Sequence, residues 1–346
     1  KQTAQGLESS GTDNAIYNEV LRTPDGQNIA PLFDALSGEI YASTKGYLLT
    51  SSSHLTGAAT ERLRSGLGLE TSQAGSSSNI WGQAFGAWGK VDSDGNASGY
   101  KNNISGVLTG IDGSPNDQWQ AGVLFGYSQS DVKSGLASSD VDSFYVGLYG
   151  ATDINDFALR LGANYSHHEI STNRSVFDRA KLNADYRADS VLTSAELAYQ
   201  STIGTARIEP FANVAFNYVA TGSMREDGRS DYALTGASGS ESLWVTGLGL
   251  RASEEFLLGN ETKLRLHGSA VWRYAAGDVT PSSRLSFNGG QAFENLGSPI
   301  ARNTAALTAG IGLDLTASAS LNADYIGEFS SNTRNHGVKA LLNVKF

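Results

Sequence analysis

The chain has 346 residues, of which only 17% are charged, with 40 glycines, 14 tyrosines, 13 phenylalanines and no cysteine. The formal net charge of −10 argues against a nucleic-acid partner, because phosphate binding requires a basic patch and the sequence shows none. The absence of cysteine excludes disulfides and thiolate metal sites. No stretch reaches the ~18–20 apolar residues of a transmembrane helix, and the first residues lack the apolar core of a signal peptide.

The first part of the chain, to about residue 70, is predicted to be helical because it has few β-branched residues. Thr23 is a candidate N-cap with Pro24 in the first turn, and apolar side chains follow at helical spacing over 32–40. From Ser37 to Arg64 the side chains are mostly small or polar, so the apolar stripe is too narrow for an ordinary core. This helix therefore requires a polar surrounding.

A turn-rich break over 71–79 separates the helical part from a region with a period of two residues. Glycine and aromatic residues fall on both faces of the first, second and fourth of these runs, so their faces are ambiguous. The twelve runs that we predict as strands cover 79–91, 102–112, 118–129, 141–151, 156–169, 187–200, 206–220, 241–256, 261–275, 303–315, 319–329 and 336–346.

The predicted connections alternate between long and short along the whole chain. The short set includes 113–117 and 152–155, and the long set consists of the connections at 92–101, 130–140, 170–186, 221–240, 276–302 and 330–335. A soluble sandwich has no reason to keep its long loops on one side, whereas an outer-membrane barrel has short periplasmic turns and longer external loops. An even number of strands also returns the C-terminus to the periplasmic side.

The polarity of the strands supports a barrel in a membrane. Their polar faces carry too much charge for a packed core unless the charges are paired, whereas a barrel with its apolar face toward lipid places them in a lumen. The mean hydropathy of −0.25 is compatible with such alternation. The predicted lumen-lining residues are Arg160, Glu209, Arg265, Arg273, Asp324 and Glu328.

The predicted fold is all-β: a 12-stranded antiparallel up-and-down transmembrane β-barrel with an N-terminal α-helix through the lumen. Such a lumen is about wide enough for one helix of ~10–12 Å. The Ser37–Arg64 helix would span about 42 Å at ~1.5 Å per residue, which matches a bilayer of ~40–45 Å. The chain then divides into a linker helix (1–27), a pore-plugging helix and turn (28–78) and the barrel (79–346). The pore-helix residues singled out are Ser37, Glu39, Lys45, His54, Glu61 and Arg62.

The segments DNAIYNEVL (13–21), APLFDALSGEIYAS (30–43), ERLR (61–64) and WGQAFGAWG (81–89) resemble the C-terminal translocator region of autotransporters, the type Va secretion proteins of Gram-negative bacteria. The resemblance extends over essentially the whole chain. It implies an outer-membrane barrel with a helix through its pore, inserted by the barrel assembly machinery, and a passenger before Lys1 that reaches the cell surface. The further partners expected are the lipid bilayer with its lipopolysaccharide, and the chain is expected to be a monomer.

Some members of this family release their passenger by cyclisation of an asparagine in the pore helix. Here no asparagine occurs between Ile29 and Ser78, so self-cleavage is not expected.

The last strand ends on an aromatic residue, which resembles the signal that outer-membrane assembly machinery recognises. The residues of this predicted assembly signal, all expected to face lipid, are Val338, Ala340, Leu342, Val344 and Phe346.

Chemical motifs have simpler interpretations in such a barrel, and we predict neither a cofactor nor a catalytic or metal site. His167 and His168 are adjacent on a strand and point to opposite faces, while His54 and His267 are expected to form hydrogen bonds in the lumen. The tryptophans near strand ends are predicted to form aromatic girdles at the two membrane interfaces; they are Trp81, Trp88, Trp119, Trp244 and Trp272.

Two alternatives stay open at this point. One is a 12-stranded outer-membrane enzyme or adhesin that acts through its extracellular loops, and the other is a channel for small solutes. In either case, the carboxylates and arginines of the lumen are expected to form a polar ladder rather than an acid–base site.

Overall fold

The computed structural model describes residues 2–11, 15–21, 30–67, 78–116, 118–176, 180–228, 231–258 and 262–345. The predicted cap at Thr23 and Pro24, and the terminal Phe346, lie outside these residues. Within these ranges the helices that precede the strands are α1 (Gln2–Ser9), α2 (Ala15–Leu21), α3 (Ala30–Ser37), α4 (Glu39–Ser51) and α5 (Ser53–Leu67).

Twelve long strands form a closed antiparallel barrel in which each strand pairs with the next and the last pairs with the first. This confirms the predicted strand number. Closure is complete over the length of β1, from Asn79 opposite Lys345 to Val91 opposite Thr333. The barrel strands are β1 (Asn79–Val91), β2 (Tyr100–Gly113), β3 (Trp119–Ser134), β4 (Ala137–Ile154), β5 (Phe157–Val176), β6 (Ala180–Tyr199), β8 (Ala206–Thr221), β12 (Gly239–Leu257), β13 (Lys263–Gly277), β16 (Asn303–Thr316), β17 (Ala319–Ser330) and β18 (Thr333–Lys345).

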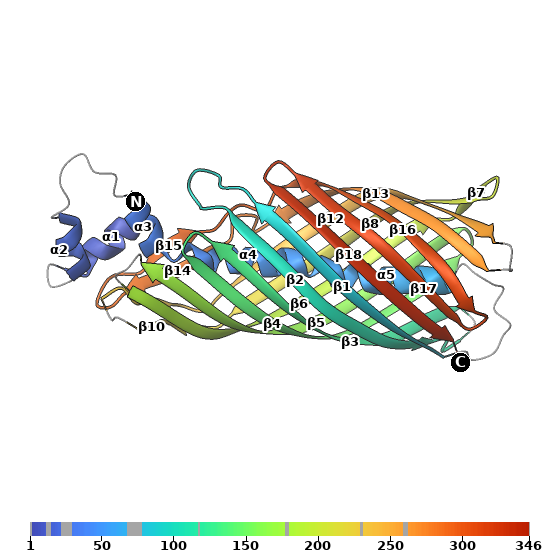
Figure 1. The fold of residues 1–346 in the computed structure, drawn as a ribbon, viewed down its shortest axis with the longest axis horizontal. Helices are drawn as coiled ribbons and strands as arrows, with labels where there is room; N and C mark the ends of the chain where they lie inside the picture. The colour runs from blue at the N-terminus through green and yellow to red at the C-terminus, as the bar shows by residue number, and fades with distance from the viewer. Residues whose placement is uncertain are drawn as a thin grey trace.

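Helices α4 and α5 run along the inside of the barrel, as Figure 1 shows in blue. Helices α1, α2 and α3 lie at one end of the barrel, and the C-terminus lies at the other (Figure 1). The end that holds α1–α3 is the predicted external end, because the two longest connections, between β8 and β12 and between β13 and β16, also lie there. Within the described ranges, no helix is both long and apolar enough to cross a bilayer.

Short strands from these two long connections form a small sheet at the external mouth. Its order is β15 (Phe293–Leu296), β14 (Ser282–Phe287), β11 (Leu234–Gly236) and β9 (Met224–Arg225). Helix α1 packs on β15 and β14, and Gly6 approaches the ring of Phe293 so closely that a Cβ would lie 2.3 Å from it. Two further short strands, β7 (Ser201–Ile203) and β10 (Asp227–Gly228), extend the barrel ladder at its rims.

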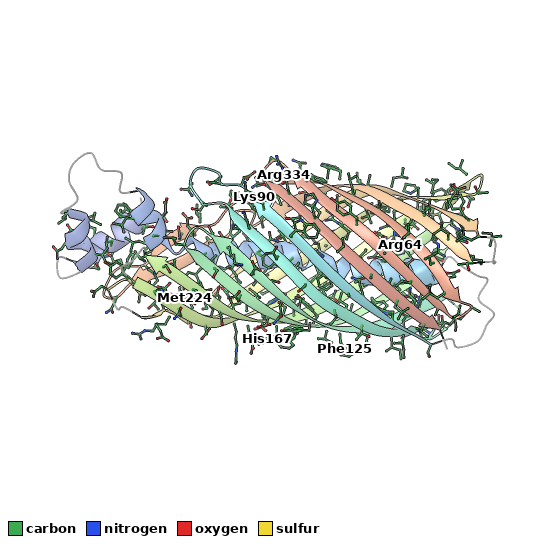
Figure 2. All side chains as sticks on the ribbon, viewed as in Figure 1. Arg64, Lys90, Phe125, His167, Met224 and Arg334 are labelled. Carbon is green, nitrogen blue, oxygen red and sulfur yellow. The ribbon has the colours of Figure 1, made fainter. Side chains whose placement is uncertain are left out.

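The middle of the barrel wall has an apolar outer face and a polar inner face. Large apolar side chains such as Val107, Phe125 and Leu148 are exposed on the outside, and Phe125 projects away from the wall in Figure 2. Asn164 and Asp324, by contrast, are buried inside. This is the polarity of a barrel in lipid, since the apolar surface faces the hydrocarbon and the charges face the lumen.

Toward the external end of β3–β6 this polarity reverses. The outer face of β5 changes from Phe157 and Tyr165 to Glu169 and Ser171, while the inner face gains Ile170, which belongs to the apolar core around α4. The barrel therefore continues above the membrane as a water-facing wall with an apolar interior.

This reversal explains two wrong predictions. Residues 130–140 and 170–186 were expected to be external loops, but β3–β4 and β5–β6 continue through them as hairpins. Gly135, with φ +56, forms the tight turn of the first hairpin in a conformation that only glycine adopts easily. The lipid-facing pattern is lost there, yet the strands continue because their side chains still alternate between water and a core.

Trp81 is a third correction, because it is not part of an aromatic girdle. It is buried inside the barrel, where its Nε1 donates to the hydroxyl of Tyr149 at 2.6 Å. The other predicted girdle residues on β1, β12 and β13, namely Trp88, Trp244 and Trp272, are exposed on the outer face.

Candidate functional site

The functional feature of the structure is the helix that occupies the lumen. In α4 every residue from Ile40 to Leu49 is buried, so the helix is enclosed on all sides. Small residues make this possible: a Cβ on Gly46 would lie 2.6 Å from Pro281 of the external loop. The chain enters the lumen through Gly38, whose φ of +70 breaks the helix between α3 and α4.

The junction between α4 and α5 is tied to the wall by an asparagine. Asn217 on β8 donates from Nδ2 to the carbonyl of Leu49 and to Oγ of Ser52, both at 2.7 Å. The bond to Leu49 satisfies a carbonyl in the last turn of α4, where backbone carbonyls lack an N–H partner within the helix. The break in the helix is therefore held by the barrel.

The external end of α4 is held by two buried charge clusters. Arg174 on β5 donates to both carboxylate oxygens of Glu226, at 2.8 and 2.6 Å, and Tyr41 donates to the same carboxylate at 2.8 Å. Lys45 donates to the carbonyl of Ser282 at 2.6 Å and lies 3.7 Å from Glu241. Glu39 accepts a hydrogen bond from the backbone of the first external loop, at Ser98.

The periplasmic half is held by two consecutive residues of α5. Arg62 forms a two-pronged ion pair with Asp112 on β2, with both N–O distances 2.7 Å. Its neighbour Glu61 pairs with Lys339 on β18. Since β2 and β18 flank β1, these two pairs attach the helix on both sides of the strand where the barrel closes.

Other charges of the lumen pair within the wall. Arg160 bridges Glu196 and Glu209 at 2.9 and 3.0 Å, and Arg251 contacts the same two carboxylates. Arg273 pairs with Glu328 and Arg265 with Glu255. Because every one of these carboxylates lies against a guanidinium, the arrangement is a charge ladder rather than an isolated acid or base.

A cavity of about 1220 Å³ remains beside α5, and its wall includes residues of β1, β2, β5, β6, β8, β12, β13 and β16–β18. Helix α5 packs against β4 and β5, so it lies to one side of the lumen. Arg64, inside the barrel in Figure 2, faces this cavity.

Apart from Ser37, which ends α3 at the external mouth, the predicted lumen and pore-helix residues lie inside the barrel, but only some of them contact one another. The hydroxyl of Ser37 donates to the carbonyl of Asp34 at 2.7 Å, at the end of α3. The ring of His54 stacks on that of Phe85 with centroids 5.3 Å apart, and its expected hydrogen bond is not found among the described residues. His267 does form one, to Asp324 at 2.5 Å. His168 is buried between Ser143 and Ser190, whereas His167 is half-exposed outside.

Several partners of these residues were missed from the sequence. Asp112 ends a strand whose faces were ambiguous, and Glu226 lies in what was predicted as an external loop. Neither position carries a local signal of its role, because the pairing depends on where the helix passes the wall. The missed residues are Asp112, Arg174, Glu196, Glu226, Glu241 and Arg251.

The terminal strand has the orientation that the assembly-signal hypothesis requires. Val338, Ala340 and Leu342 are exposed on the outer face and Val344 is half-exposed, while Lys339 faces the lumen. Leu341 is fully buried against the interior core.

Comparison with known proteins gives consistent matches. The family model "Autotransporter beta-domain" matches residues 80–326. An extracellular serine protease of Serratia marcescens is 31% identical over 340 residues, and the match covers 96% of this chain. The chain spans 32% of the length of that curated relative.

Solved structures share the fold. The translocator domain of the autotransporter NalP from Neisseria meningitidis superposes with a TM-score of 0.71 at 16% identity, over 89% of this chain and 100% of that one. The β domain of the Bordetella autotransporter BrkA gives 0.60 at 18% identity, over 78% and 99%. The chain belongs to the autotransporter β-domain family and is an outer-membrane translocator domain of a Gram-negative bacterium.

Proposed function

We propose that this domain carries a passenger, attached before Lys1, to the cell surface and then anchors it there with the pore closed by α4 and α5. The observation that carries this proposal is the path of the chain: α1–α3 lie at the external mouth and α4–α5 descend through the lumen toward the first strand. In this proposal residues 1–27 are the linker to the passenger, 28–78 the plug and turn, and 79–346 the barrel.

The work of the domain is then physical rather than catalytic. The lumen carboxylates are engaged by arginines, lysines or histidines, which suits a polar conduit better than a reactive centre. The likeness to translocator domains supports this function over a barrel enzyme, an adhesin or a solute channel. The relative's name, extracellular serine protease, is compatible with chemistry that resides in the exported part of the protein.

The proposed partners follow from the surfaces of the barrel. The outward apolar face of β18 supports recognition by the barrel assembly machinery, and the polar wall above the aromatic girdle supports contact with lipopolysaccharide headgroups. A closed barrel leaves no free long edge, which supports a monomer.

Surface display tests the main proposal. An epitope fused before Lys1 is expected to bind antibody on intact cells, whereas the same epitope inserted at Gly204, in the turn between β7 and β8, is expected to bind only after permeabilisation. An N-terminal epitope that stays hidden on intact cells, in barrels that resist heat in gel electrophoresis, would contradict the proposed orientation.

Deleting Phe346 tests the assembly signal. The amount of folded barrel in cells is expected to fall more than the unfolding midpoint of barrels refolded in detergent, because recognition occurs only during assembly. Heat-modifiable mobility of membrane extracts and urea unfolding of purified protein measure the two effects. Equal losses in both assays would reduce Phe346 to an ordinary contributor to stability.

A further inference from the structure

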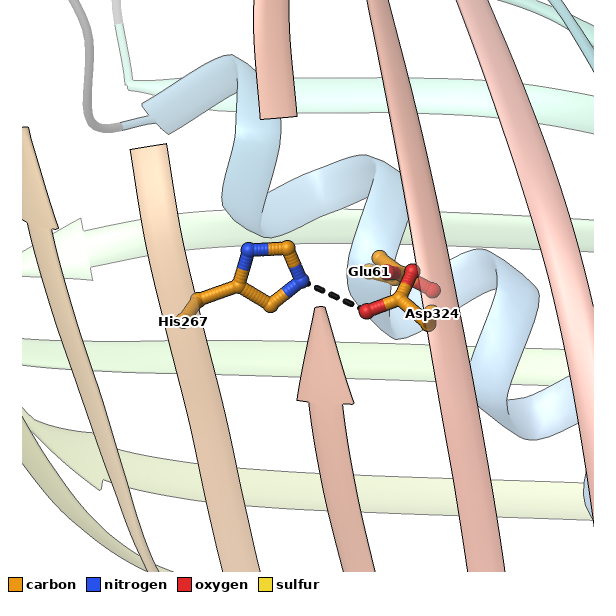
Figure 3. A group of neighbouring side chains, drawn as sticks. All are labelled: Glu61, His267 and Asp324. Atoms are coloured by element: carbon orange, nitrogen blue, oxygen red, sulfur yellow. Dashed lines mark hydrogen bonds and ion pairs between the residues drawn. The ribbon is translucent and has the colours of Figure 1, made fainter. Parts of the chain in front are cut away.

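Three potential metal ligands from three different elements meet where α5 passes the barrel wall. They are Glu61 on α5, His267 on β13 and Asp324 on β17, and their ligand atoms all lie within 4.8 Å of one another. Figure 3 shows the imidazole of His267 directed at Asp324, with Glu61 directly beside that carboxylate. The Nε2 of His267 lies 2.5 Å from Oδ1 of Asp324.

The charges of this cluster are not balanced by its hydrogen bonds. The side chain of Asp324 has 0% exposure, and its Oδ2 has no hydrogen-bond partner among the described residues. In Figure 3 the oxygen of Asp324 that does not face His267 points toward the carboxylate of Glu61. Lys339 contacts Glu61 and neutralises only one of the two carboxylates. A buried acceptor that faces a second carboxylate is unfavourable unless a cation or a shared proton lies between them.

We propose that Glu61, His267 and Asp324 form a binding site for a divalent transition-metal cation of the zinc class. One imidazole nitrogen with two carboxylate oxygens is a donor set that Zn²⁺ accepts, whereas Ca²⁺ and Mg²⁺ prefer oxygen ligands alone. Binding replaces the hydrogen bond between His267 and Asp324 with two metal–ligand bonds.

The cavity provides access to this site. Glu61, His267 and Lys339 all line it, so a hydrated cation reaches two of the ligands without passing through the wall. The ammonium of Lys339 lies on a flexible stem at the same cavity and competes with the metal for Glu61. Bound metal would attach α5 to β13 and β17, in addition to its attachment to β2 through Arg62.

Calorimetric titration of Zn²⁺ into the full chain, stripped with a chelator and held in detergent micelles, tests this site. One saturable site is expected in the wild type. His267→Asn and Asp324→Asn are each expected to raise the Kd about tenfold or more, as the loss of a ligand or its close support does. Lys339→Gln is expected to lower the Kd, because the competing ammonium is gone.

Two controls separate this site from general binding. His167→Asn removes a histidine that pairs with Asp189 at 2.8 Å on the outer face, outside the three-ligand cluster, and is expected to leave the Kd unchanged. Mg²⁺ in place of Zn²⁺ is expected to give no saturable heat.

The proposal is overturned if the wild type shows no saturable Zn²⁺ binding, or if His267→Asn binds as tightly as the wild type. It is also overturned if Lys339→Gln weakens binding while its barrel still shows heat-modifiable mobility, since Lys339 would then support the site rather than compete for it. Lys339→Gln is expected to bind Zn²⁺ more tightly than the wild type. A misfolded variant would bind Zn²⁺ more weakly, so misfolding cannot produce the expected result.

Discussion

Replacing Arg62 with methionine is expected to lower the free energy of unfolding by about 3–5 kcal/mol, which is the usual cost of removing one partner of a buried ion pair. Arg62 and Asp112 have side chains that are 3% and 0% exposed. Methionine fills part of the space but leaves the carboxylate of Asp112 without its cation. Gln120 and Tyr149 still donate to Asp112, both at 2.9 Å, yet neither neutralises its charge.

Urea unfolding of the refolded chain in detergent, followed by tryptophan fluorescence, measures this loss. Arg187→Met is the matched control, because Arg187 is 73% exposed on the outer wall and lies 3.9 Å from Glu169. Exposed ion pairs of that kind contribute little to the free energy of unfolding, so the control is expected to unfold at the wild-type midpoint. Equal midpoints for the two variants would show that the pair between α5 and β2 does not hold the helix.

Removing residues 1–67 is expected to raise the conductance of the barrel in planar bilayers about tenfold, because a helix of ~10–12 Å diameter occupies most of the lumen. The intact chain is expected to conduct weakly, since α4 is enclosed on all sides and the external mouth is covered by α1, α3 and the small sheet.

Removal of residues 1–21 alone is the control for this prediction. It deletes α1 and α2 but leaves α3, the small sheet and the enclosed helix α4 in the lumen, so the conductance is expected to stay near that of the intact chain. A large conductance in the intact chain would favour a solute channel. An unchanged conductance after removal of residues 1–67, in a barrel that still shows heat-modifiable mobility, would mean that the helix is not the plug.

The strand number and the membrane barrel could be predicted from the sequence because a two-residue period is a local property. Runs such as 156–169 show which residues share a face before any tertiary contact is known. The small and polar composition from Ser37 to Arg64 likewise indicated a helix that only a polar lumen could surround. The structure confirms the barrel and the helix in its lumen. The polar surrounding was a wrong prediction for α4, because apolar side chains of β3–β6 form a core around that part of the helix.

The partners of the lumen residues depend on tertiary structure. The roles of Asp112 and Glu226 could not be predicted from the sequence. The local sequence of β2 does not show that Arg62 will lie opposite Asp112, and the loop after β8 does not show that Arg174 will lie opposite Glu226. The site that Glu61 forms with His267 and Asp324 also depends on tertiary structure. Glu61 is more than two hundred residues before His267 in the sequence, and His267 is about sixty residues before Asp324.

The sequence by itself determined that this chain forms a 12-stranded barrel with its apolar face outward and a helix for its lumen. Only the tertiary structure decided where the membrane ends on each strand. Toward the external end the apolar residues of β3–β6 turn inward around α4, so the same alternation that marks a lipid-facing strand also builds a water-facing wall. Periodicity shows that two faces differ, but the surroundings on each side determine which face is buried.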